Sequence, residues 1–443
     1  MKKALQGLRA IKRYPAGAWR RLALLANALR SPLLLQALRG PRPGPADASP
    51  EIVMVVISNL RIDPRVLREA KTLASAGYRV KILYPDTDRP YFVEQALDWG
   101  PGISFRPLPW QAAAFQLEFP WVCATELLAA ASEERPFAFH CHDLNTALVG
   151  LAAAHRVGAY CVCDFHEWFS ENVSWNAARE CYAPHPWLKK QIYRLIERVA
   201  LRRANAVVTV CDSIAVELNA IHGGRPVQVI RNIPDLAAST ACDYPPLKKQ
   251  LGLRCDQFVL LWQGGTGPTR LIEPIIEALQ YAPGVVFVIR GPSLDLFGEG
   301  YRSLAEKCGV ADRLVLVPPV PSTDVVAAAR GADAGIWTLP KLSRNFYYAL
   351  PNKIFEYMAA RIPVLAANYP EARRMVEGNG VGLCFDPYDP RSIAAQINRL
   401  GDEPGLVAPV RAAFPGALRH IDADNEWQKL VDIYRRLQRG EAA

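Results

Sequence analysis

The chain has 443 residues, of which 50% are hydrophobic and 21% are charged, so it is long enough for two or three domains with substantial cores. This composition excludes a disordered or collagen-like chain, and no uninterrupted apolar stretch of about 18 residues predicts a transmembrane helix. The formal net charge of +9 is concentrated at one end, because residues 1–46 carry ten Lys and Arg and no Asp or Glu.

Residues 1–46 are predicted to form a basic amphipathic arm. Apolar side chains recur there at spacings of three or four, in helical pieces interrupted near Pro15 and Pro32. This pattern is typical of a segment that lies in an anionic membrane interface, where each cation contributes about 1 kcal/mol. One alternative is a solvated helix packed on the rest of the protein. The other is a nucleic-acid arm, which no basic stripe elsewhere supports. Residues 40–50, rich in Pro and Gly, are expected to be a linker.

From residue 52 short apolar runs alternate with amphipathic helices. The run IVMVVIS at 52–58 is typical of a buried parallel strand, and Asp63-Pro64 provide an N-cap and a first-turn proline for the next helix. Four turn-bounded runs further along predict strands at 80–85, 137–142, 159–165 and 206–210, and a fifth predicts one at 227–232.

The pattern restarts after a less regular segment. A strand is predicted at 258–264, followed by the loop GGTGP and a helix near 269–281. Further strands are expected at 285–291, 314–319, 334–340 and 363–367, with a helix at 350–360. Two such series predict the α/β class, with two doubly wound Rossmann-like domains at 50–235 and 250–410. We expect the ligand site beyond the carboxyl ends of the strands, between the two domains.

The loop Gly264-Gly265-Thr266-Gly267 is a candidate phosphate site. Glycine allows backbone N–H groups to approach a phosphate, and a helix N-terminus favours an anion. Arg270 follows closely and is able to bind a diphosphate bidentately. The loop matches neither of the two common nucleotide-binding glycine motifs, so a tight turn with a solvated arginine remains the alternative.

Glu356 is a candidate for binding a diol. It lies on the predicted helix that begins at Pro351-Asn352-Lys353, among apolar neighbours. A carboxylate there is able to accept hydrogen bonds from two ligand hydroxyls. The alternative is an ordinary helix ion pair.

Polar residues at two strand ends raise the question of a metal. His140 and His142 alternate along one strand and supply only two ligands on one face, with no clear third ligand. The segment with Asp164, His166 and Glu167 gives the same count. The triplet Asp86-Thr87-Asp88 has a metal-binding pattern, but its Pro-flanked setting favours a turn. We therefore expect no metal site.

Cysteine usage and missing motifs exclude other classes. The ten cysteines show neither zinc spacing nor the framework of a secreted domain, so we expect reduced cysteines in a cytoplasmic protein. No nucleophile elbow is present, which leaves a Ser/His/Asp hydrolase unsupported.

Seven stretches, in order along about residues 52–400, resemble the family 4 glycosyltransferases, retaining enzymes of the GT-B fold. They are SNLRIDPRVLREAKTLASAGYRVKILYP, HCHDLNTALVG, CDFHEWFSE, RRANAVVTVCDSIAVEL, VIRNIPD, VLLWQGGTGPTRLIEPIIEAL and ALPNKIFEYMAARIPVLA. The last contains the PNKIFEYM form of the donor motif, which resembles that of one subgroup. The helix predicted at 424–438, in the C-terminal segment 411–443, resembles the segment that crosses back to the N-terminal domain in this fold.

The resemblance implies transfer of a sugar from a nucleoside-diphosphate sugar to a hydroxyl, with retention of configuration and without a metal or other cofactor. It places the acceptor on the N-terminal domain and a UDP- or GDP-sugar on the C-terminal domain. It gives His142 a contact with the donor sugar, Arg270 the diphosphate and Glu356 the ribose, and these three are the candidate catalytic residues. The implied donor set is Gly264, Gly265, Thr266, Arg270, Pro351, Asn352, Lys353 and Glu356. The implied acceptor-side set is Asp63, Arg65, His166 and Glu167.

The chain departs from the family pattern at two positions. Tyr348 stands where the first glutamate of a pair is usual, and Gly265 stands where a second basic diphosphate ligand is usual. These losses leave open a changed donor or an inactive relative.

The sequence thus predicts a hexosyltransferase of cell-surface polysaccharide or glycolipid assembly. It is expected at the inner face of the cell membrane, held by residues 1–46, with a lipid-linked or glycan acceptor and no nucleic-acid partner. The alternatives are a nucleotide-sugar epimerase of the same fold and a scaffold that has lost turnover.

Overall fold

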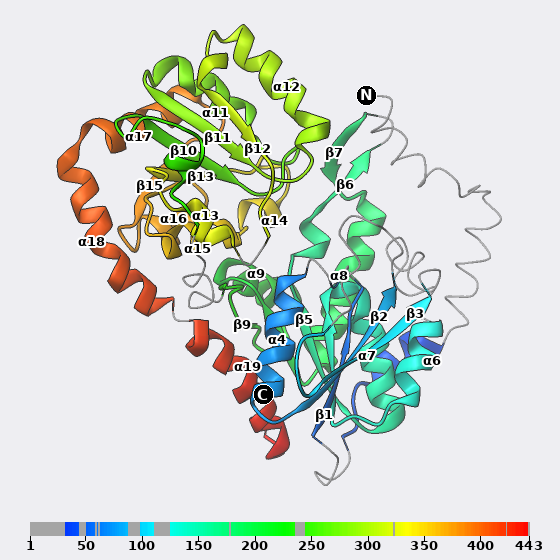
Figure 1. Cartoon of the computed structure of the whole chain (residues 1–443). Helices are drawn as coiled ribbons and strands as arrows, with labels where there is room; N and C mark the ends of the chain where they lie inside the picture. Colours follow the sequence, from blue (N-terminus) through cyan, green and yellow to red (C-terminus); the bar gives the residue numbers. More distant parts are fainter. Residues whose placement is uncertain are drawn as a thin grey trace. The chain divides into compact units, whose positions relative to one another are not determined.

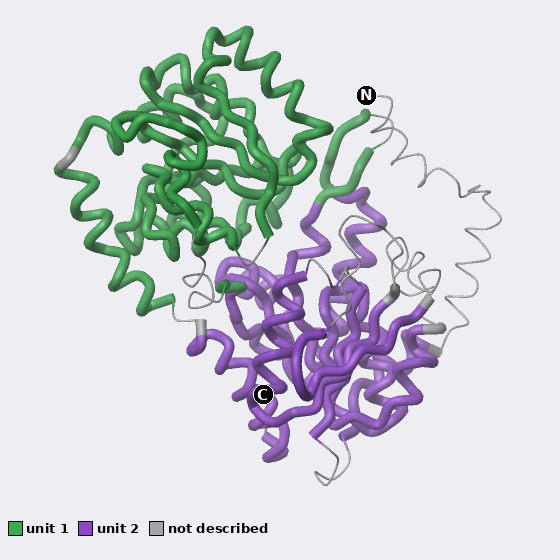
Figure 2. Tube along the Cα trace, viewed as in Figure 1, with its two compact units in different colours: residues 1–11, 173–184, 232–423 green, residues 12–172, 185–231, 424–443 purple. Residues whose placement is uncertain are grey.

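The structure is a computed structural model. It describes residues 32–43, 50–57, 60, 63–86, 98–109, 125–176, 179–234, 244–321, 324–421 and 423–441. The chain divides into two compact units, each described here by itself (Figure 2). The N-terminal unit contains residues 12–172, 185–231 and 424–443, and the C-terminal unit contains residues 1–11, 173–184 and 232–423.

The N-terminal unit is built on a seven-stranded sheet in the order β3-β2-β1-β4-β5-β8-β9 (Figure 1). Its strands are β1 (Glu51–Val55), β2 (Arg79–Asp86), β3 (Ile103–Pro109), β4 (Ala138–His142), β5 (Tyr160–Phe165), β8 (Ala206–Thr209) and β9 (Gln228–Val229). Every neighbouring pair is parallel, for example Ile52 beside Val80 and beside Ala138. The central strands β1, β4 and β5 are buried, as expected for a parallel sheet with helices on both faces, and β4 and β5 carry polar residues toward their carboxyl ends.

Helices of the N-terminal unit pack against this sheet and against each other. They are α3 (Pro32–Arg39), α4 (Pro64–Ser75), α6 (Thr125–Glu133), α7 (Asp143–Val157), α8 (Trp187–Arg203), α9 (Asp212–His222) and α19 (Ala423–Gln438), with the 3₁₀ turn η3 (Phe169–Glu171). The closest approach is that of α7 to β4, where a Cβ on Gly150 would lie 1.8 Å from Sγ of Cys141. Glycine is therefore required at position 150 for this helix to reach the strand.

The C-terminal unit has a six-stranded parallel sheet in the order β12-β11-β10-β13-β14-β15. The strands are β10 (Phe258–Gln263), β11 (Val285–Arg290), β12 (Leu314–Val317), β13 (Ala334–Trp337), β14 (Val364–Ala367) and β15 (Gly382–Phe385). The helices are α10 (Leu247–Gln250), α11 (Glu273–Ala278), α12 (Leu294–Lys307), α13 (Val325–Ala329), α14 (Arg344–Tyr347), α15 (Asn352–Ala359), α16 (Pro370–Val376), α17 (Pro390–Asp402) and α18 (Pro404–His420), with the 3₁₀ turns η5 (Leu279–Tyr281) and η6 (Ala311–Arg313). The unit also includes the antiparallel hairpin of β6 (Val173–Asn176) and β7 (Cys181–Pro184).

These two parallel sheets confirm the predicted class of two Rossmann-like α/β domains. The segmentation differs from the expected 411 boundary. The helix α18 continues to His420 and stays with the C-terminal unit, so the chain changes units at 423/424. The C-terminal helix that then joins the N-terminal unit is α19.

The predicted basic arm is described only from residue 32. There α3 packs on α7, with Leu33 and Ala37 buried, while Gln36 accepts a hydrogen bond from Arg156. This part of the arm therefore packs on the body of the protein, which was the alternative to membrane contact. Residues 1–31 and most of the linker lie outside the described residues. Among the described helices, none is both long and apolar enough to cross a membrane.

Candidate functional site

The glycine-rich loop of the C-terminal unit begins where β10 ends. Gly264 has φ 145° and Gly267 has φ 117°, which are conformations that favour glycine. The backbone N–H of Gly264 donates to the carbonyl of Arg290 at 2.9 Å, and that of Gly267 donates to the hydroxyl of Tyr301 at 2.9 Å. The loop is therefore fixed by β11 and α12, and the hydroxyl of Thr266 adds a hydrogen bond to the carbonyl of Pro292 at 2.8 Å.

Two cationic side chains lie against this loop. A Cβ placed on Gly264 would be 2.5 Å from Cε of Lys353, and a Cβ placed on Gly265 would be 3.4 Å from Nε of Arg270. The structure thus brings together the loop, Arg270 and Lys353, as the donor set predicts. The glycines leave the space that these side chains occupy.

Glu356 lies in the same place, one turn along α15. Its side chain is buried, and both of its carboxylate oxygens accept hydrogen bonds from Nζ of Lys353 at 3.1 Å. The next residue, Tyr357, accepts a hydrogen bond at its hydroxyl from the backbone N–H of Gln263 at 2.9 Å. This hydrogen bond fastens α15 to the end of β10 and sets the position of Glu356 beside the loop.

The helix expected near 269–281 was predicted with the wrong start. Leu271 has φ 54°, in the left-handed region, and the helix α11 begins only at Glu273. The hydroxyl of Thr338 donates to the carbonyls of Arg270 and Leu271, both at 2.9 Å, and holds this turn. The glycine loop therefore does not run directly into a helix, and the helix beside it is α15, whose N-cap is Pro351.

A cavity of about 760 Å³ in the C-terminal unit lies at the opposite ends of the strands. It is lined by Phe258 and Val285, the first residues of β10 and β11, and by Asp333 and Pro363, which precede β13 and β14. Ligands of such sheets bind beyond the carboxyl ends. This cavity is therefore separate from the candidate site.

Tyr348 ends the short helix α14. Its ring lies 5.2 Å from that of Tyr347, and the guanidinium of Arg344 lies over it at 5.8 Å. An aromatic ring at this position contacts its own helix and offers no carboxylate. At the position of the first glutamate of the family's pair, this chain therefore has an aromatic ring in place of a carboxylate.

In the N-terminal unit, a network of charged residues collects at the carboxyl ends of β4 and β5. Arg65, on α4, donates from Nε and Nη2 to the two carboxylate oxygens of Asp164 at 2.8 and 2.7 Å. Its Nη1 donates to the carbonyl of Ile230 at 2.9 Å, and its Nε lies 3.0 Å from Oε1 of Glu69. Both carboxylates and the guanidinium are almost completely buried.

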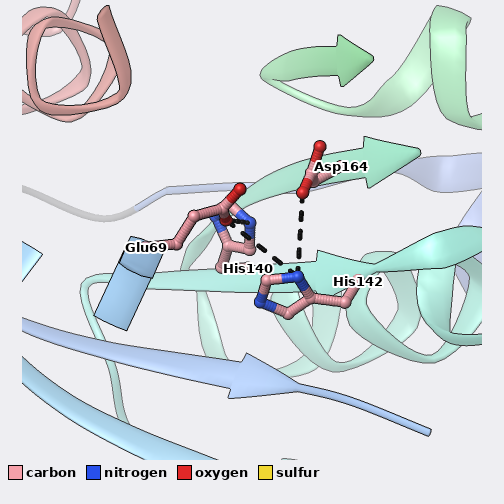
Figure 3. A group of neighbouring side chains, drawn as sticks. All are labelled: Glu69, His140, His142 and Asp164. Carbon is pink, nitrogen blue, oxygen red and sulfur yellow. Dashed lines mark ion pairs between the residues drawn. The ribbon is translucent and has the colours of Figure 1, made fainter. Parts of the chain in front are cut away.

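The histidines of β4 face this network (Figure 3). Nε2 of His140 lies 2.9 Å from Oε2 of Glu69, and Nδ1 of His142 lies 3.7 Å from Oδ2 of Asp164. Because side chains alternate along a strand, His140 and His142 share the face toward α4, while Cys141 between them faces α7. The two expected histidines are thus brought together with Asp164.

Glu69 was not identified from the sequence, and the number of possible metal ligands was therefore underestimated. Glu69, His140, His142 and Asp164 offer ligand atoms that all lie within 4.8 Å of one another. The count of two ligands was therefore too low. Arg65 already bridges both carboxylates of this group, so its positive charge lies where a cation would bind. Glu69 is separated from the histidines by about 70 positions in the sequence, and no local spacing marks it.

His166 and Asp143 complete the network. Nε2 of His166 lies 3.0 Å from Oδ2 of Asp164 and 3.1 Å from Nδ1 of His142. Burial lowers the pKa of His166, but the carboxylates of Asp143 and Asp164 outweigh it and raise the pKa to about 10. Burial and the neighbouring histidines hold the pKa of His142 well below its usual value.

Four further predicted residues lie at the edge of this network or are not placed in it. Asp63 caps α4 by accepting a hydrogen bond from the backbone N–H of Val66 at 3.3 Å. Glu167 is exposed and accepts a hydrogen bond from Asn172. The side chain of Asp86 and the whole of Asp88 lie outside the described residues.

Two family matches cover most of the chain. Residues 62–232 match the family described as a glycosyl transferase 4-like domain. Residues 243–413 match the family described as glycosyl transferases group 1. The two matches divide between the two units close to residue 232.

The chain is also similar to individual glycosyltransferases and to solved structures. The D-inositol 3-phosphate glycosyltransferase of Acidothermus cellulolyticus is 29% identical over 398 residues, which cover 84% of each chain. Sucrose-phosphate synthase from Thermosynechococcus elongatus has a TM-score of 0.68 at 16% identity, covering 88% of this chain and 100% of the other. HepE from Anabaena, in complex with UDP and glucose, has a TM-score of 0.63 at 17% identity, covering 86% and 98%.

Proposed function

The chain belongs to the glycosyltransferases of the GT-B fold and is a hexosyltransferase, and from this premise we propose its reaction. The enzyme moves a sugar from a nucleoside-diphosphate sugar, UDP- or GDP-linked, to a hydroxyl of a glycan or lipid-linked acceptor. Transfer proceeds with retention and without a metal or other cofactor. The enzyme acts in the assembly of cell-surface polysaccharide or glycolipid.

The observation that carries the proposal is the position of Lys353 over the glycine loop. The family usually has two basic residues that bind the diphosphate, and in this chain Gly265 stands at the position of one of them. The side chain of Lys353 crosses Gly264 and reaches the loop from α15, opposite Arg270 at Gly265. Lys353 therefore takes the role of the missing basic residue, and the absent side chain at Gly264 leaves the space that this needs.

The pair Lys353–Glu356 supports a site that is stable before the donor binds. A buried carboxylate needs a counter-charge, and Lys353 provides it at 3.1 Å. When a diphosphate occupies the loop, Lys353 turns to the phosphate oxygens. Glu356 then accepts hydrogen bonds from the two ribose hydroxyls, which replace those of the ammonium.

The chemistry follows from charge. As the glycosidic bond breaks, negative charge develops on the departing diphosphate. Arg270, Lys353 and the N-terminus of α15 lie beside the loop and stabilise that charge. A departing phosphate oxygen then accepts the proton of the attacking hydroxyl on the same face of the sugar, so no side-chain base is assigned.

Two relatives support the choice of substrates. The structure of HepE holds UDP and glucose, which fits a uridine donor and a hexose. The name of the Acidothermus relative describes transfer to D-inositol 3-phosphate, an acceptor with free hydroxyls. For this chain a membrane-bound acceptor is favoured by the ten basic residues of the segment 1–46, which carries no acidic residue.

Thermal melting with nucleotides tests the donor site. Purified protein is melted with UDP, GDP, ADP, CMP and dTDP, and the same series is repeated with Glu356→Gln. One nucleotide at 100 times its dissociation constant is expected to add about 2.7 kcal/mol to the wild type, which is a shift of several degrees. Glu356→Gln weakens this shift because an amide accepts fewer hydrogen bonds than a carboxylate.

The matched control is Glu377→Gln. Glu377 is exposed, caps the end of α16 and forms an ion pair with Arg373 of that helix. This variant is expected to melt with the wild-type shift. No shift with any of the five nucleotides, in folded protein, contradicts the proposal and favours a scaffold. Conversion of a nucleotide sugar without an acceptor would select an epimerase instead.

A further inference from the structure

The ring of His142 presents its two nitrogens to different surroundings. Nδ1 faces the charged network, 3.1 Å from Nε2 of His166 and 4.0 Å from Oε2 of Glu69. Nε2 is buried and has no hydrogen-bond partner among the described residues. A buried polar atom without a partner destabilises the folded state, so its retention in a folded enzyme needs a reason.

The proton on His166 is fixed by its neighbours. Nε2 of His166 faces Oδ2 of Asp164 at 3.0 Å, and Nδ1 faces Oδ2 of Asp143 at 3.6 Å. With a carboxylate at each nitrogen, the imidazolium form is strongly favoured, and both nitrogens carry hydrogen. The pKa of His166 is raised to about 10 by these two carboxylates, against the opposing effect of burial.

A protonated His166 allows only one form of His142. The one hydrogen on Nε2 of His166 is shared between Oδ2 of Asp164 at 3.0 Å and Nδ1 of His142 at 3.1 Å. A hydrogen on Nδ1 of His142 would face that hydrogen, so the neutral ring carries its proton on Nε2. The groups that face the His142 ring are Arg65 and Glu69 from α4, His140 from β4, Asp164 from β5, and His166. The carboxylates among them lie 3.7 and 4.0 Å from Nδ1, too far to accept a hydrogen bond from it.

We infer that His166 is a positioning residue that holds His142 as the neutral Nε2–H tautomer, so that a single oriented N–H is kept for the sugar substrate. The inference rests on the proposed function for the identity of that substrate. The tautomer itself is independent of it. On substrate binding, the partnerless N–H gains the acceptor that the free enzyme does not supply.

The backbone between the two strands supports this role. Asp143 follows His142 directly and has φ 63°, a conformation that side chains other than glycine rarely adopt. Its Oδ1 accepts a hydrogen bond from the backbone N–H of His166 at 3.0 Å. Asp143 therefore ties the end of β4, where His142 lies, to the segment after β5 that carries His166.

A metal ion bound by Glu69, His140, His142 and Asp164 is the competing explanation for the arrangement of these side chains. The four ligand atoms lie close enough together, but Arg65 and His166 already balance Glu69 and Asp164. In addition, a cation there would use Nδ1 of His142 and compete with His166. The two arrangements therefore predict different spectra.

The experiment is nitrogen-15 NMR of the full chain labelled at histidine, at pH 8, with His142→Gln used to assign the signal. Wild type is expected to show His142 as one neutral Nε2–H tautomer. In His166→Phe, which keeps a ring but donates no hydrogen bond, the His142 signal shifts toward the Nδ1–H form. In His166→Gln, whose amide is able to donate to Nδ1, the Nε2–H form returns.

Two spectroscopic results overturn the inference. One is a wild-type His142 in the Nδ1–H or cationic form, a measurement that needs no variant to fold. The other is a stoichiometric shift of the His140 and His142 signals on addition of zinc chloride alone, which assigns the cluster to a metal. His155→Gln, which contacts Gly40 elsewhere in the unit, is the control and leaves the His142 signal unchanged.

Kinetics then separate this inference from the proposed function. With an active sugar donor, His166→Phe is expected to lower kcat by about 10²-fold with KM little changed, and His166→Gln to recover most of it. An Nε2–H tautomer in a protein that transfers no sugar would end the proposed function and leave the tautomer standing. Sugar transfer that is unaffected in His166→Phe would overturn the positioning role alone.

Discussion

The hydroxyl of Tyr434 lies 2.7 Å from Nδ1 of His140, and this contact joins the last helix of the chain to the buried network of the N-terminal unit. Nε2 of the same imidazole lies 2.9 Å from Glu69. The indole of Trp427, also on α19, lies under the guanidinium of Arg65 at 5.5 Å. The helix α19 therefore forms one wall of the network that positions His142.

Tyr434→Phe is expected to lower the free energy of unfolding by about 1–2 kcal/mol, because it leaves a buried imidazole nitrogen without its partner. Urea denaturation followed by fluorescence measures this. Tyr78→Phe is the matched control, since its hydroxyl donates to Gln438 on the same helix in a partly exposed position. A loss at Tyr78 equal to that at Tyr434 would contradict the special role of the buried contact.

The stability of the protein is expected to fall as the pH rises from 7 to 9. His166 has its pKa raised to about 10 in the folded state, so its contribution is complete below pH 6.5 and is lost as the pH rises toward 10. The upper limit is about 1.4 kcal/mol per pH unit. His142 acts on the other side, because its lowered pKa removes stability below pH 6.5.

His166→Gln tests that assignment by denaturation at each pH. The variant is expected to lose the decline between pH 7 and 9, while His155→Gln keeps it. Burial raises the pKa of Asp143 from 3.8 to about 7, so its contribution to stability is lost mainly as the pH rises to 7, below the interval from pH 7 to 9. An unchanged slope in His166→Gln would show that another group carries the titration.

Lys353→Met is expected to weaken binding of the nucleoside diphosphate by about 10- to 100-fold and binding of the free nucleoside much less. The lost charge-assisted hydrogen bonds are worth about 1.5–3 kcal/mol. Isothermal titration of both ligands gives the ratio. Lys307→Met, an exposed change at the end of α12, is the control. Equal losses for the two ligands would place Lys353 away from the phosphates.

The same variant leaves Glu356 buried without its cation. The double variant Lys353→Met/Glu356→Gln removes that uncompensated charge and separates a binding defect from a folding defect. It is expected to melt above the single variant while the loss of diphosphate binding remains.

Gly335→Ala is expected to destabilise the C-terminal unit by about 1–3 kcal/mol through overpacking. A Cβ there would lie 2.4 Å from the ring of Tyr357, which is fixed beneath β13. Gly300→Ala is the matched control, because no atom lies within 4 Å of its Cβ and the residue is inside α12. It is expected to stabilise by about 0.5–1 kcal/mol. Thermal unfolding of the two variants should therefore move in opposite directions.

Deletion of residues 1–31 is expected to abolish sedimentation with vesicles of phosphatidylglycerol and phosphatidylcholine. The deletion retains α3, whose Leu33 and Ala37 are buried on the unit. Binding of the full chain should weaken with salt and be absent on phosphatidylcholine alone.

A second variant, Trp187→Ser/Leu188→Ser, changes the most exposed apolar residues of α8, which are 74% and 64% exposed. It is expected to retain binding. Loss of binding in this variant, with binding kept in the deletion, would move the membrane contact from the arm to α8.

Much of the fold was predictable because buried parallel strands are continuous apolar runs. The predicted ranges 52–58, 159–165 and 258–264 correspond to β1, β5 and β10 within a few residues. The strands β3, β6, β7 and β15 were not predicted. The hairpin β6–β7 is partly exposed, and its two strands, VSWN and CYAP, are too short for a pattern to mark them.

The candidate site was predictable only where its residues are close in sequence. The loop at Gly264 and the helix with Glu356 each carry a local pattern, and the structure brings them together through Lys353. Glu69 carries no such pattern. Its role depends on the crossing of α4 over β4 and β5, which is a property of tertiary structure. The start of α11 was missed because Leu271 adopts a left-handed turn that its residue type disfavours.

The packing of α19 has a consequence for how the chain is made. Buried side chains of this helix, among them Leu430, Ile433 and Tyr434, complete a unit whose sheet is encoded almost 200 residues earlier. During synthesis from the N-terminus, the first sheet emerges long before this helix does. The N-terminal unit therefore remains open at that side until translation has passed residue 434. An expression product that stops at residue 235 would leave the same apolar face exposed and is expected to aggregate.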